Sequence, residues 1–269
     1  MTDADRTFAG SIPAHYDRYL GPLIFEPYAA DLAARLADLR TGPLLEIAAG
    51  TGIVTRVLAR RLGAGIAIVA SDLNQAMVDF AAAQGTVRPV TWQQADAQAL
   101  PFADAAFAAV ACQFGVMFFP DKVAAFRQAR RVLEPGGRFV FNVWCAIEDN
   151  GITQAIHEAM AALFPADPPR FLTRAPHGYH DTALIADQLR QAGFADIAVE
   201  TVALRCRAAG PRDPAIGFCQ GSPLRNEIEA RGADLLSAAT DAAAAAVAAR
   251  FGSGPIEAGM AAHVITARR

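Results

Sequence analysis

Hydrophobic and polar positions along the chain form two kinds of stretch, short apolar runs and longer amphipathic segments. The apolar runs lie at 44–47, 65–71, 106–114 and 138–144, and a further short strand is expected around 89–93. Runs without a polar face are typical of parallel strands that are buried on both sides. Between them, apolar positions spaced three and four residues apart predict helices. This alternation predicts an α/β fold built around a mostly parallel sheet.

The first apolar run leads into a turn of small residues, and an amphipathic helix pattern follows at once. The run contains Glu46, and the turn contains Gly50 and Gly52. Glycines permit backbone angles and close approaches that a Cβ atom would block. The free N–H groups of the first helical turn then face whatever lies above the strand end. A nucleotide-type cofactor binds in such places, and an acid before the turn suits a ligand with an ammonium group better than a diphosphate.

Two common nucleotide motifs fit this turn less well. Ala48 stands where a dinucleotide fingerprint has its first glycine, and the third glycine is absent. No Gly-Lys-Ser/Thr follows, so the P-loop pattern is missing as well. An NAD-dependent oxidoreductase on the same kind of sheet stays open as an alternative, as does a buried strand that simply ends in a glycine turn.

Polar and aromatic residues end two of the other predicted strands. Asp72 follows the second apolar run and lies 22 positions beyond Gly50. An acid at this spacing can accept hydrogen bonds from both ribose hydroxyls of a nucleotide, although Asp72 could instead cap the next helix. Gln113 and Phe114 end the run at 106–114. Because ligands collect at the carboxyl ends of parallel strands, we expect both residues beside the glycine turn.

Two passages resemble the class I S-adenosylmethionine (SAM) methyltransferases. Residues 44–52, LLEIAAGTG, resemble their motif I, usually acid-x-Gly-x-Gly-x-Gly, with Ala48 as a departure. Residues 131–141, RVLEPGGRFVF, are similar to the ubiquinone and menaquinone biosynthetic methyltransferases. The resemblance runs from about Tyr16 to Trp144. It implies a SAM-dependent methyltransferase that binds SAM as cofactor and releases S-adenosylhomocysteine.

Motifs and resemblance together predict a set of cofactor-binding residues. These are Tyr16, Glu46, Ala48, Gly50, Thr51, Gly52, Asp72, Leu73, Met77, Asp96, Ala97, Gln113 and Phe114. The resemblance implies that Tyr16 covers the ligand and that Leu73 and Met77 flank the adenine. It also implies that Asp96 binds the adenine amino group while the N–H of Ala97 meets the ring. A core role for Met77 and a turn-forming role for Asp96 stay open.

The same resemblance implies the fold in more detail. It is a doubly wound, mostly parallel seven-stranded sheet with an antiparallel C-terminal hairpin, helices on both faces and a helical lid formed by insertions. We expect a single methyltransferase domain over 1–269. Its parts are an N-terminal cap at 1–40, a SAM-binding core at 41–144, lid insertions at 145–180 and 211–255, and the C-terminal part of the sheet at 181–210 and 256–269.

SAM carries an activated methyl group, so the protein mainly needs to hold the nucleophile of the acceptor in line with the sulfonium. A general base helps when the acceptor is a hydroxyl or a protonated amine. His177 and His180 are the candidate bases, since histidine titrates near neutral pH and both fall in the predicted lid. Each could instead be an ordinary surface residue. The sequence shows no hydrolase or metalloenzyme motif, and we expect no metal.

Composition narrows the class of partner. The 269 residues carry a net charge of −3, and this acidic balance argues against a nucleic-acid substrate and favours a small-molecule acceptor. No apolar run is long enough to span a membrane, and the first ten residues do not resemble a signal peptide, so we expect a cytoplasmic protein. A homodimer and a non-catalytic SAM-binding module stay open.

A helix predicted after Asp121 carries a cluster of arginines. Apolar residues occupy one face, and Arg127, Arg130 and Arg131 occupy others. Asp121 is expected to cap this helix at its N-terminus. We interpret the arginines as a solvated face and not as a binding patch.

Overall fold

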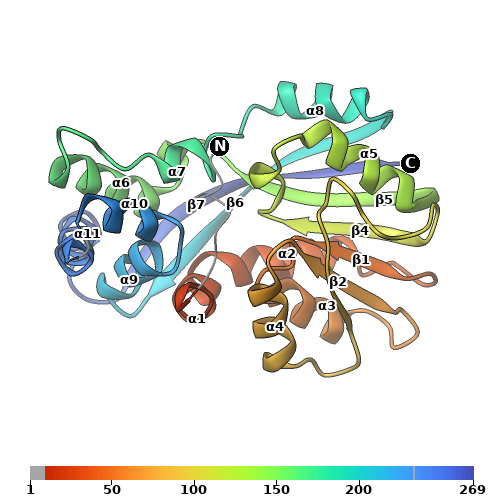
Figure 1. Ribbon diagram of the computed structural model, residues 1–269, viewed down its shortest axis with the longest axis horizontal. Coiled ribbons are helices and arrows are strands. Elements are labelled where there is room, and N and C mark those ends of the chain that lie inside the picture. The colour runs from red at the N-terminus through yellow and green to blue at the C-terminus, as the bar shows by residue number, and fades with distance from the viewer. Residues whose placement is uncertain (1–9, 233) are drawn as a thin grey trace. The chain divides into compact units, whose positions relative to one another are not determined.

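The computed structural model describes residues 10–232 and 234–269, and its core is a seven-stranded sheet (Figure 1). The strand order is β3-β2-β1-β4-β5-β7-β6. The strands are β1 (Leu44–Ile47), β2 (Ile68–Asp72), β3 (Thr91–Gln94), β4 (Phe107–Gln113), β5 (Leu133–Trp144), β6 (Asp196–Ala208) and β7 (Ile256–Arg268). This mixed sheet, surrounded by helices, confirms the predicted class I α/β fold.

Helices connect the strands in most of the chain. They are α1 (Ile12–His15), α2 (Glu26–Arg35), α3 (Ile53–Arg61), α4 (Gln75–Gln84), α5 (Lys122–Val132), α6 (Gly151–Leu163), α7 (Phe171–Arg174), α8 (Thr182–Gln191), α9 (Arg212–Gln220), α10 (Leu224–Arg231) and α11 (Leu235–Phe251). A π-helix covers Tyr16–Phe25, and short 3-10 helices cover Val116–Phe118 and Ile147–Asp149. No helix within residues 10–232 or 234–269 is long and apolar enough to cross a membrane.

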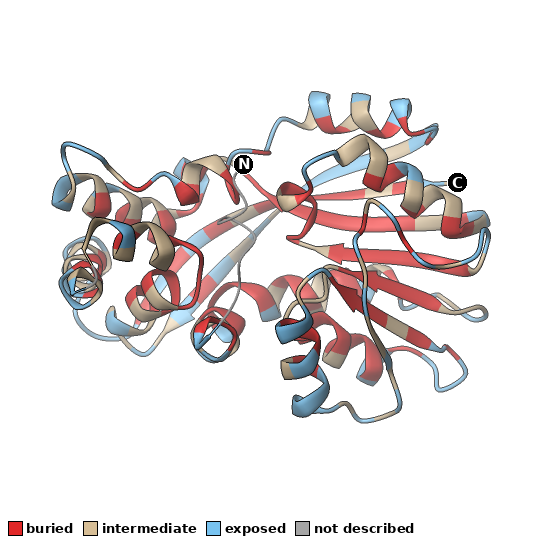
Figure 2. Cartoon of the chain, viewed as in Figure 1, coloured by how far each residue is buried: buried red, intermediate tan, exposed pale blue. Residues whose placement is uncertain are grey.

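The parallel part of the sheet comprises β1 to β5. Leu44 of β1 pairs with Ile68 of β2 on one side and with Ala109 of β4 on the other. Both neighbours run in the same direction as β1, and Figure 2 shows β1 and β4 buried along most of their length. The apolar runs at 44–47 and 106–114 therefore correspond to strands with no solvent-facing side, as predicted. In contrast, β3 lies at the edge of the sheet, and its residues are exposed or half-buried.

The last two strands are antiparallel to their neighbours. Thr201 of β6 contacts His263 of β7, while Cys206, further along β6, contacts Ala258, earlier in β7. Residue numbers therefore rise along one strand and fall along the other, which defines antiparallel pairing. β6 lies at the edge of the sheet, and most of its residues are exposed or half-buried. This arrangement confirms the predicted antiparallel C-terminal strands.

One strand, β5, begins earlier than the sequence pattern predicts. We expected β5 to begin at Arg138 after a break at the Pro-Gly-Gly passage, but it begins at Leu133. Leu133 pairs with Phe107 and Arg138 pairs with Ala109, so β4 uses two positions where β5 uses five. The intervening residues form a bulge, in which Gly136 has a φ of 80°. The proline and glycines thus deform the strand without preventing it.

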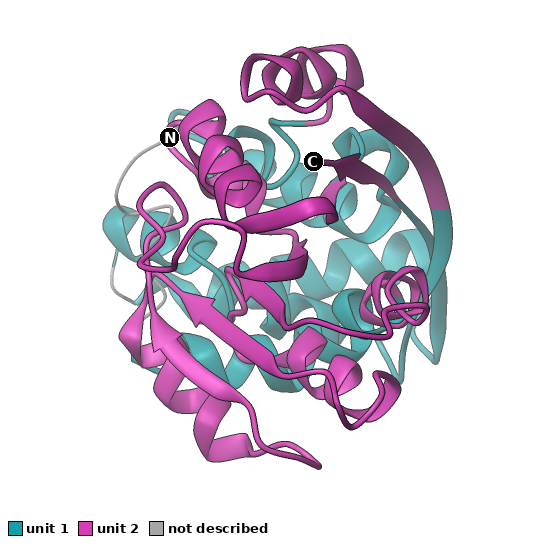
Figure 3. Cartoon of the chain, turned by 90° about the vertical axis from the view of Figure 1, so that its right-hand side faces the viewer, with its two compact units in different colours: residues 1–27, 144–179, 203–261 teal, residues 28–143, 180–202, 262–269 magenta. Residues whose placement is uncertain are grey.

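The chain divides into two compact units (Figure 3). Unit 1 comprises residues 1–27, 144–179 and 203–261, and unit 2 comprises residues 28–143, 180–202 and 262–269. Within unit 1, α11 packs against α6 and α9. Most of the two insertions expected to form a lid fall in unit 1. Their role as a lid stays a prediction.

Candidate functional site

The glycine turn after β1 adopts the backbone conformation that its small residues permit. Ala48, Gly50 and Gly52 all have positive φ angles, of 53°, 57° and 80°. Such angles are costly for residues with a Cβ and nearly free for glycine. A Cβ on Gly52 would lie 2.9 Å from the ring of Trp92. The family pattern has glycine at position 48, where the backbone needs a positive φ. This chain has an alanine there, so its backbone is strained at that residue.

Asp72 and the glycine turn meet at the carboxyl ends of β1 and β2. Oδ2 of Asp72 accepts a hydrogen bond from the backbone N–H of Gly50 at 2.9 Å. Its other oxygen, Oδ1, accepts from the backbone N–H of Asn74 at 2.8 Å. Asn74, not Asp72, is the N-cap residue of α4. The carboxylate is therefore fixed against the turn, and the helix-capping alternative for Asp72 is wrong.

Glu46 lies beneath the turn and is 1% exposed. The hydroxyl of Thr55, in α3, donates a hydrogen bond of 2.6 Å to its carboxylate. Burial, together with the smaller effect of the nearby negative charge of Asp72, raises the pKa of Glu46 to about 8, against the opposing effects of Thr55 and Arg56. Thr55 has no sequence signal of its own, because a threonine in a helix is common.

The two acids make this edge of unit 2 suitable for a cation. Burial also raises the pKa of Asp72, although the N–H groups of Asn74 and Gly50 oppose this effect. Removing two carboxylates from water penalises their charged forms. A positively charged group close to both would offset that penalty, as a sulfonium or an ammonium can.

The four predicted adenine contacts lie in the segments that follow β2 and β3. Leu73 is exposed, while Met77 is buried in α4. The side-chain amide of Gln94, at the end of β3, donates to the carbonyl of Leu73 at 3.0 Å, which joins the two strand ends. Asp96 lies just beyond, is exposed, and accepts from the N–H of Gln98 at 2.8 Å. Asp96 thus forms a turn, one of its two predicted roles, and its contact with adenine stays a prediction, as does that of the buried Ala97.

The end of β4 joins the same region. Phe114 has a φ of 50°, and its N–H donates to the side-chain oxygen of Asn142 in β5 at 2.9 Å. A Cβ on Gly115 would lie 2.4 Å from the Cβ of Ala48, so the turns after β1 and β4 are closely packed. Gln113 and Phe114 are therefore near the glycine turn, as expected. Asn142 was missed, since a lone asparagine within an apolar strand has no distinctive pattern.

Tyr16 and the two candidate bases are divided between the units. Tyr16 belongs to unit 1, where its ring stacks on Phe25 with centroids 4.6 Å apart. His177 also belongs to unit 1 and is buried, whereas His180 belongs to unit 2 and is exposed. Nδ1 of His177 lies 2.9 Å from the carbonyl oxygen of Cys145. A carbonyl only accepts, so Nδ1 carries a proton and donates it in this contact.

Thr51 completes the predicted set and is buried, with its carbonyl accepting from Arg56 at 2.7 Å. Within the residues that the structure describes, no group of three or more His, Cys, Asp or Glu side chains could hold a metal ion. The polar groups that unit 2 collects at its strand ends are therefore carboxylates, amides and backbone N–H groups.

Comparisons with known proteins agree on one family. A family model described as a methyltransferase domain matches residues 45–141. The ubiquinone/menaquinone biosynthesis C-methyltransferase UbiE of Caulobacter sp. is 31% identical over 189 residues, which are 62% of this chain and 73% of that protein. UbiE of Marinomonas sp. is 30% identical over 164 residues, which are 56% of this chain and 65% of that protein, slightly less than two thirds of its length.

Solved structures share the fold. The phosphoethanolamine N-methyltransferase 2 of Haemonchus contortus, in complex with phosphomonomethylethanolamine and S-adenosylhomocysteine, matches with a TM-score of 0.63 at 18% identity. The match covers 99% of this chain and 60% of that one. The YcgJ protein of Bacillus subtilis matches with a TM-score of 0.57 at 17% identity, over 90% of this chain and 98% of that one.

Proposed function

The chain belongs to the class I SAM-dependent methyltransferases, and we propose that it transfers the methyl group of SAM to a small organic acceptor. SAM supplies a methyl group that is already activated on a sulfonium, so the protein needs to bind, orient and exclude water. Membership of this family sets aside the NAD-dependent alternative. The relatives are named as methyltransferases of ubiquinone and menaquinone biosynthesis, which supports a small acceptor. A cytoplasmic location and a homodimer stay predictions.

One contact carries the cofactor proposal. The carboxylate of Asp72, at the end of β2, and the N–H of Gly50, in the turn after β1, are 2.9 Å apart, although the two residues are 22 positions apart in sequence. A carboxylate held in this way presents acceptors to paired hydroxyl donors, which the ribose of SAM carries. Nothing lies within 4 Å of the position where a Cβ of Gly50 would be, so a ligand can approach the backbone there.

The charges at the site fit the same ligand. Glu46 and Asp72 are both buried, and burial raises the pKa of each carboxyl. SAM has two positively charged groups, the sulfonium and the ammonium. Binding of these cations would favour the ionised carboxylates, while a dinucleotide diphosphate would be repelled by them.

Removal of the Asp72 carboxylate is the direct test. We expect Asp72→Ala to weaken S-adenosylhomocysteine binding about 100-fold, because charge-assisted hydrogen bonds contribute ~1.5–3 kcal/mol each. Isothermal titration calorimetry measures the change. Asp79→Ala is the matched control, because Asp79 is an exposed carboxylate of α4 in the same unit, bonded to the side chain of Gln75. Equal affinities of the wild type and Asp72→Ala would contradict the ribose assignment.

The class of acceptor needs a separate experiment. The protein would be incubated with methyl-labelled SAM and with cell extract divided into small molecules, proteins and nucleic acids. We expect the label in the small-molecule fraction. Label in a macromolecular fraction would overturn the acceptor class, and cofactor binding without transfer to any fraction would favour the non-catalytic alternative.

We propose His177, and not His180, as the general base where the acceptor must lose a proton. The contact with Cys145 leaves Nε2 of His177 as the basic nitrogen, and the buried ring lies 6.0 Å from that of Trp144, centroid to centroid. His177→Gln should reduce the rate of methyl transfer about 100-fold and leave S-adenosylhomocysteine affinity unchanged. The exposed residue provides the control, His180→Gln. A normal rate in His177→Gln would refute this role.

A further inference from the structure

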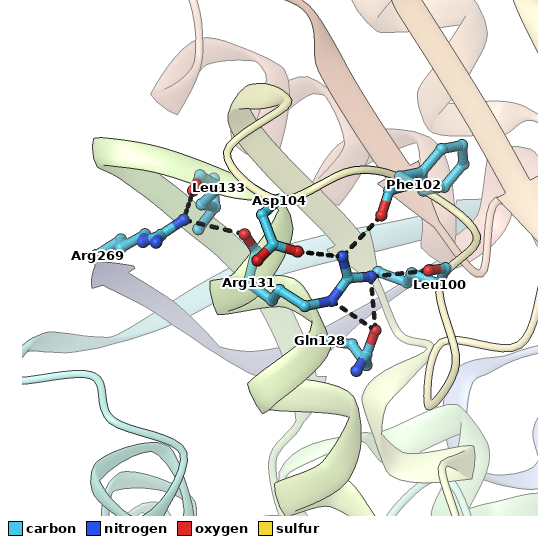
Figure 4. Close-up of polar contacts among 7 residues, drawn as sticks. All are labelled: Leu100, Phe102, Asp104, Gln128, Arg131, Leu133 and Arg269. Carbon is cyan, nitrogen blue, oxygen red and sulfur yellow. Dashed lines mark hydrogen bonds and ion pairs between the residues drawn. The ribbon is translucent and has the colours of Figure 1, made fainter.

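Arg131, in the last turn of α5, uses all five of its N–H donors. Figure 4 shows the guanidinium between the helix and the loop that joins β3 to β4. Its nitrogens donate to the carbonyl of Leu100 at 2.8 Å, to the carbonyl of Phe102 at 2.7 Å and to the carboxylate of Asp104 at 2.7 Å. Two more contacts, of 3.1 and 2.8 Å, reach the side-chain oxygen of Gln128.

These contacts show that the solvated-face interpretation is wrong for Arg131. Its side chain is 29% exposed, and it satisfies two backbone carbonyls outside regular secondary structure. Arg127, on the same helix, is exposed and makes a single backbone contact, of 3.5 Å, with Gln191. The spacing of the arginines does not distinguish the two, because their roles depend on the loop that α5 faces.

The loop held by Arg131 covers residues 95–105 and begins with the predicted adenine contacts. The side-chain oxygen of Gln98 accepts from the N–H of Asp121, the N-cap residue of α5, at 2.9 Å. The N–H of Gln98 in turn donates to Asp96 at 2.8 Å. The loop is therefore attached to α5 twice, near its start at the N-terminus of the helix and further along at Arg131.

We propose that Arg131 is a positioning residue for SAM, which fixes the loop so that Asp96 and Ala97 are presented to the adenine. This inference rests on the proposed function, because it assumes that the loop borders the cofactor. The guanidinium acts through the loop backbone and not by contact with the ligand. Without it, the carbonyls of Leu100 and Phe102 lose their donors, and the loop samples other conformations that the cofactor must restrict when it binds.

A lysine cannot replace this arginine fully. Lysine has three donors on one nitrogen, whereas the planar guanidinium has five donors in a fixed fork. The acceptors of Arg131 surround the edge of the guanidinium in different directions, some on the loop and one on the helix (Figure 4). We therefore expect Arg131→Lys to be intermediate between the wild type and Arg131→Gln.

The test compares S-adenosylhomocysteine binding, turnover and loop protection in these variants. Arg131→Gln should raise the dissociation constant about tenfold, while the transfer rate at saturating SAM stays within about twofold. Hydrogen exchange should become faster for amides of residues 98–106. Arg127→Gln controls for loss of charge on α5. Ile185→Val, a buried substitution on α8, provides a variant with lower thermal stability and an intact loop.

A double-mutant cycle with Asp96→Ala separates positioning from general destabilisation. If Arg131 acts through Asp96, Arg131→Gln should weaken binding much less in the Asp96→Ala background than in the wild type. Fully additive losses, or an equal loss of affinity in Ile185→Val, would overturn the inference. Absence of binding by the wild type would instead refute the proposed function, so the two failures are distinguishable.

Discussion

Two loops of unit 2 carry six of the thirteen predicted cofactor-binding residues, and the two loops are held in different ways. The loop at 48–52 is fixed from within, by positive φ angles and by the bond from Gly50 to Asp72. The loop at 95–105 is fixed from outside, by Arg131 and the N-terminus of α5. The first uses buried carboxylates, whereas the second uses a partly exposed guanidinium.

This difference predicts different sensitivities. Buried carboxylates lose or gain charge when pH changes, because burial shifts their pKa toward neutrality. A guanidinium stays protonated over the whole range in which proteins are folded. The loop at 48–52 should therefore respond to pH, and the loop at 95–105 should respond to substitution of one arginine.

The largest expected effect is a pH dependence of the free energy of unfolding that comes from Glu46, beneath the loop at 48–52, and not from the loop at 95–105. The pKa of Glu46 is about 8 in the folded protein, whereas the ordinary value for a glutamate side chain is 4.5. The folded state thus binds the proton of the Glu46 carboxyl more tightly than the unfolded state does. The resulting contribution to the free energy of unfolding is fully present below pH 4.5 and is lost as pH rises to about 8. Glu46→Gln keeps an acceptor for Thr55 and removes the titration. We expect the variant to gain stability relative to the wild type between pH 5 and 8, measured by urea unfolding.

Two further measurements complete this test. Thr55→Val removes the hydroxyl that lowers the pKa of Glu46, so it should make the loss of stability with pH larger. Calorimetry of SAM binding near pH 7, in buffers of different ionisation enthalpy, should detect proton release by the wild type and less by Glu46→Gln. Parallel stability curves for the wild type and Glu46→Gln would show that Glu46 does not titrate in this interval.

Much of the fold could be predicted because its signals are local. Apolar runs without a polar face identified the central parallel strands, such as β1 and β4, which the structure shows buried between neighbours. The start of β5 at Leu133 could not be predicted, because a bulge lets a strand continue through Pro135, Gly136 and Gly137. Proline and glycine indicate irregularity in a sequence, but not whether the chain turns or only bulges.

The residues of the candidate site also fall into two groups, those that a local sequence pattern identifies and those that it does not. The glycine turn and Asp72 were found because glycines and a strand-ending acid form a recognisable pattern with a fixed spacing. Asn142 and Arg131 were missed or misinterpreted, since their partners lie 28 and 31 residues away in sequence. A single polar residue whose partner is distant leaves no periodicity, and only the folded chain brings the two together.

The smallest expected effect tests what the two loops have in common. Each contains an alanine in the left-handed region, Ala48 with a φ of 53° and Ala105 with a φ of 52°. This conformation costs an L-residue ~1–2 kcal/mol, while glycine loses ~0.5–1 kcal/mol more backbone entropy on folding. Ala48→Gly and Ala105→Gly should therefore each stabilise the protein by about 0.5 kcal/mol in urea unfolding.

Ala49→Gly is the matched control, because Ala49 neighbours Ala48 and does not have a positive φ. It should destabilise by ~0.5–1 kcal/mol, as glycine does where no strain is relieved. A similar loss in Ala48→Gly would show that its backbone is not strained. A larger gain at Ala48 than at Ala105 would indicate that the Cβ of Ala48 is also compressed by the turn at Gly115, where there is no room for a second Cβ. The strain of the first loop would then come from packing between strand ends as well as from its own backbone.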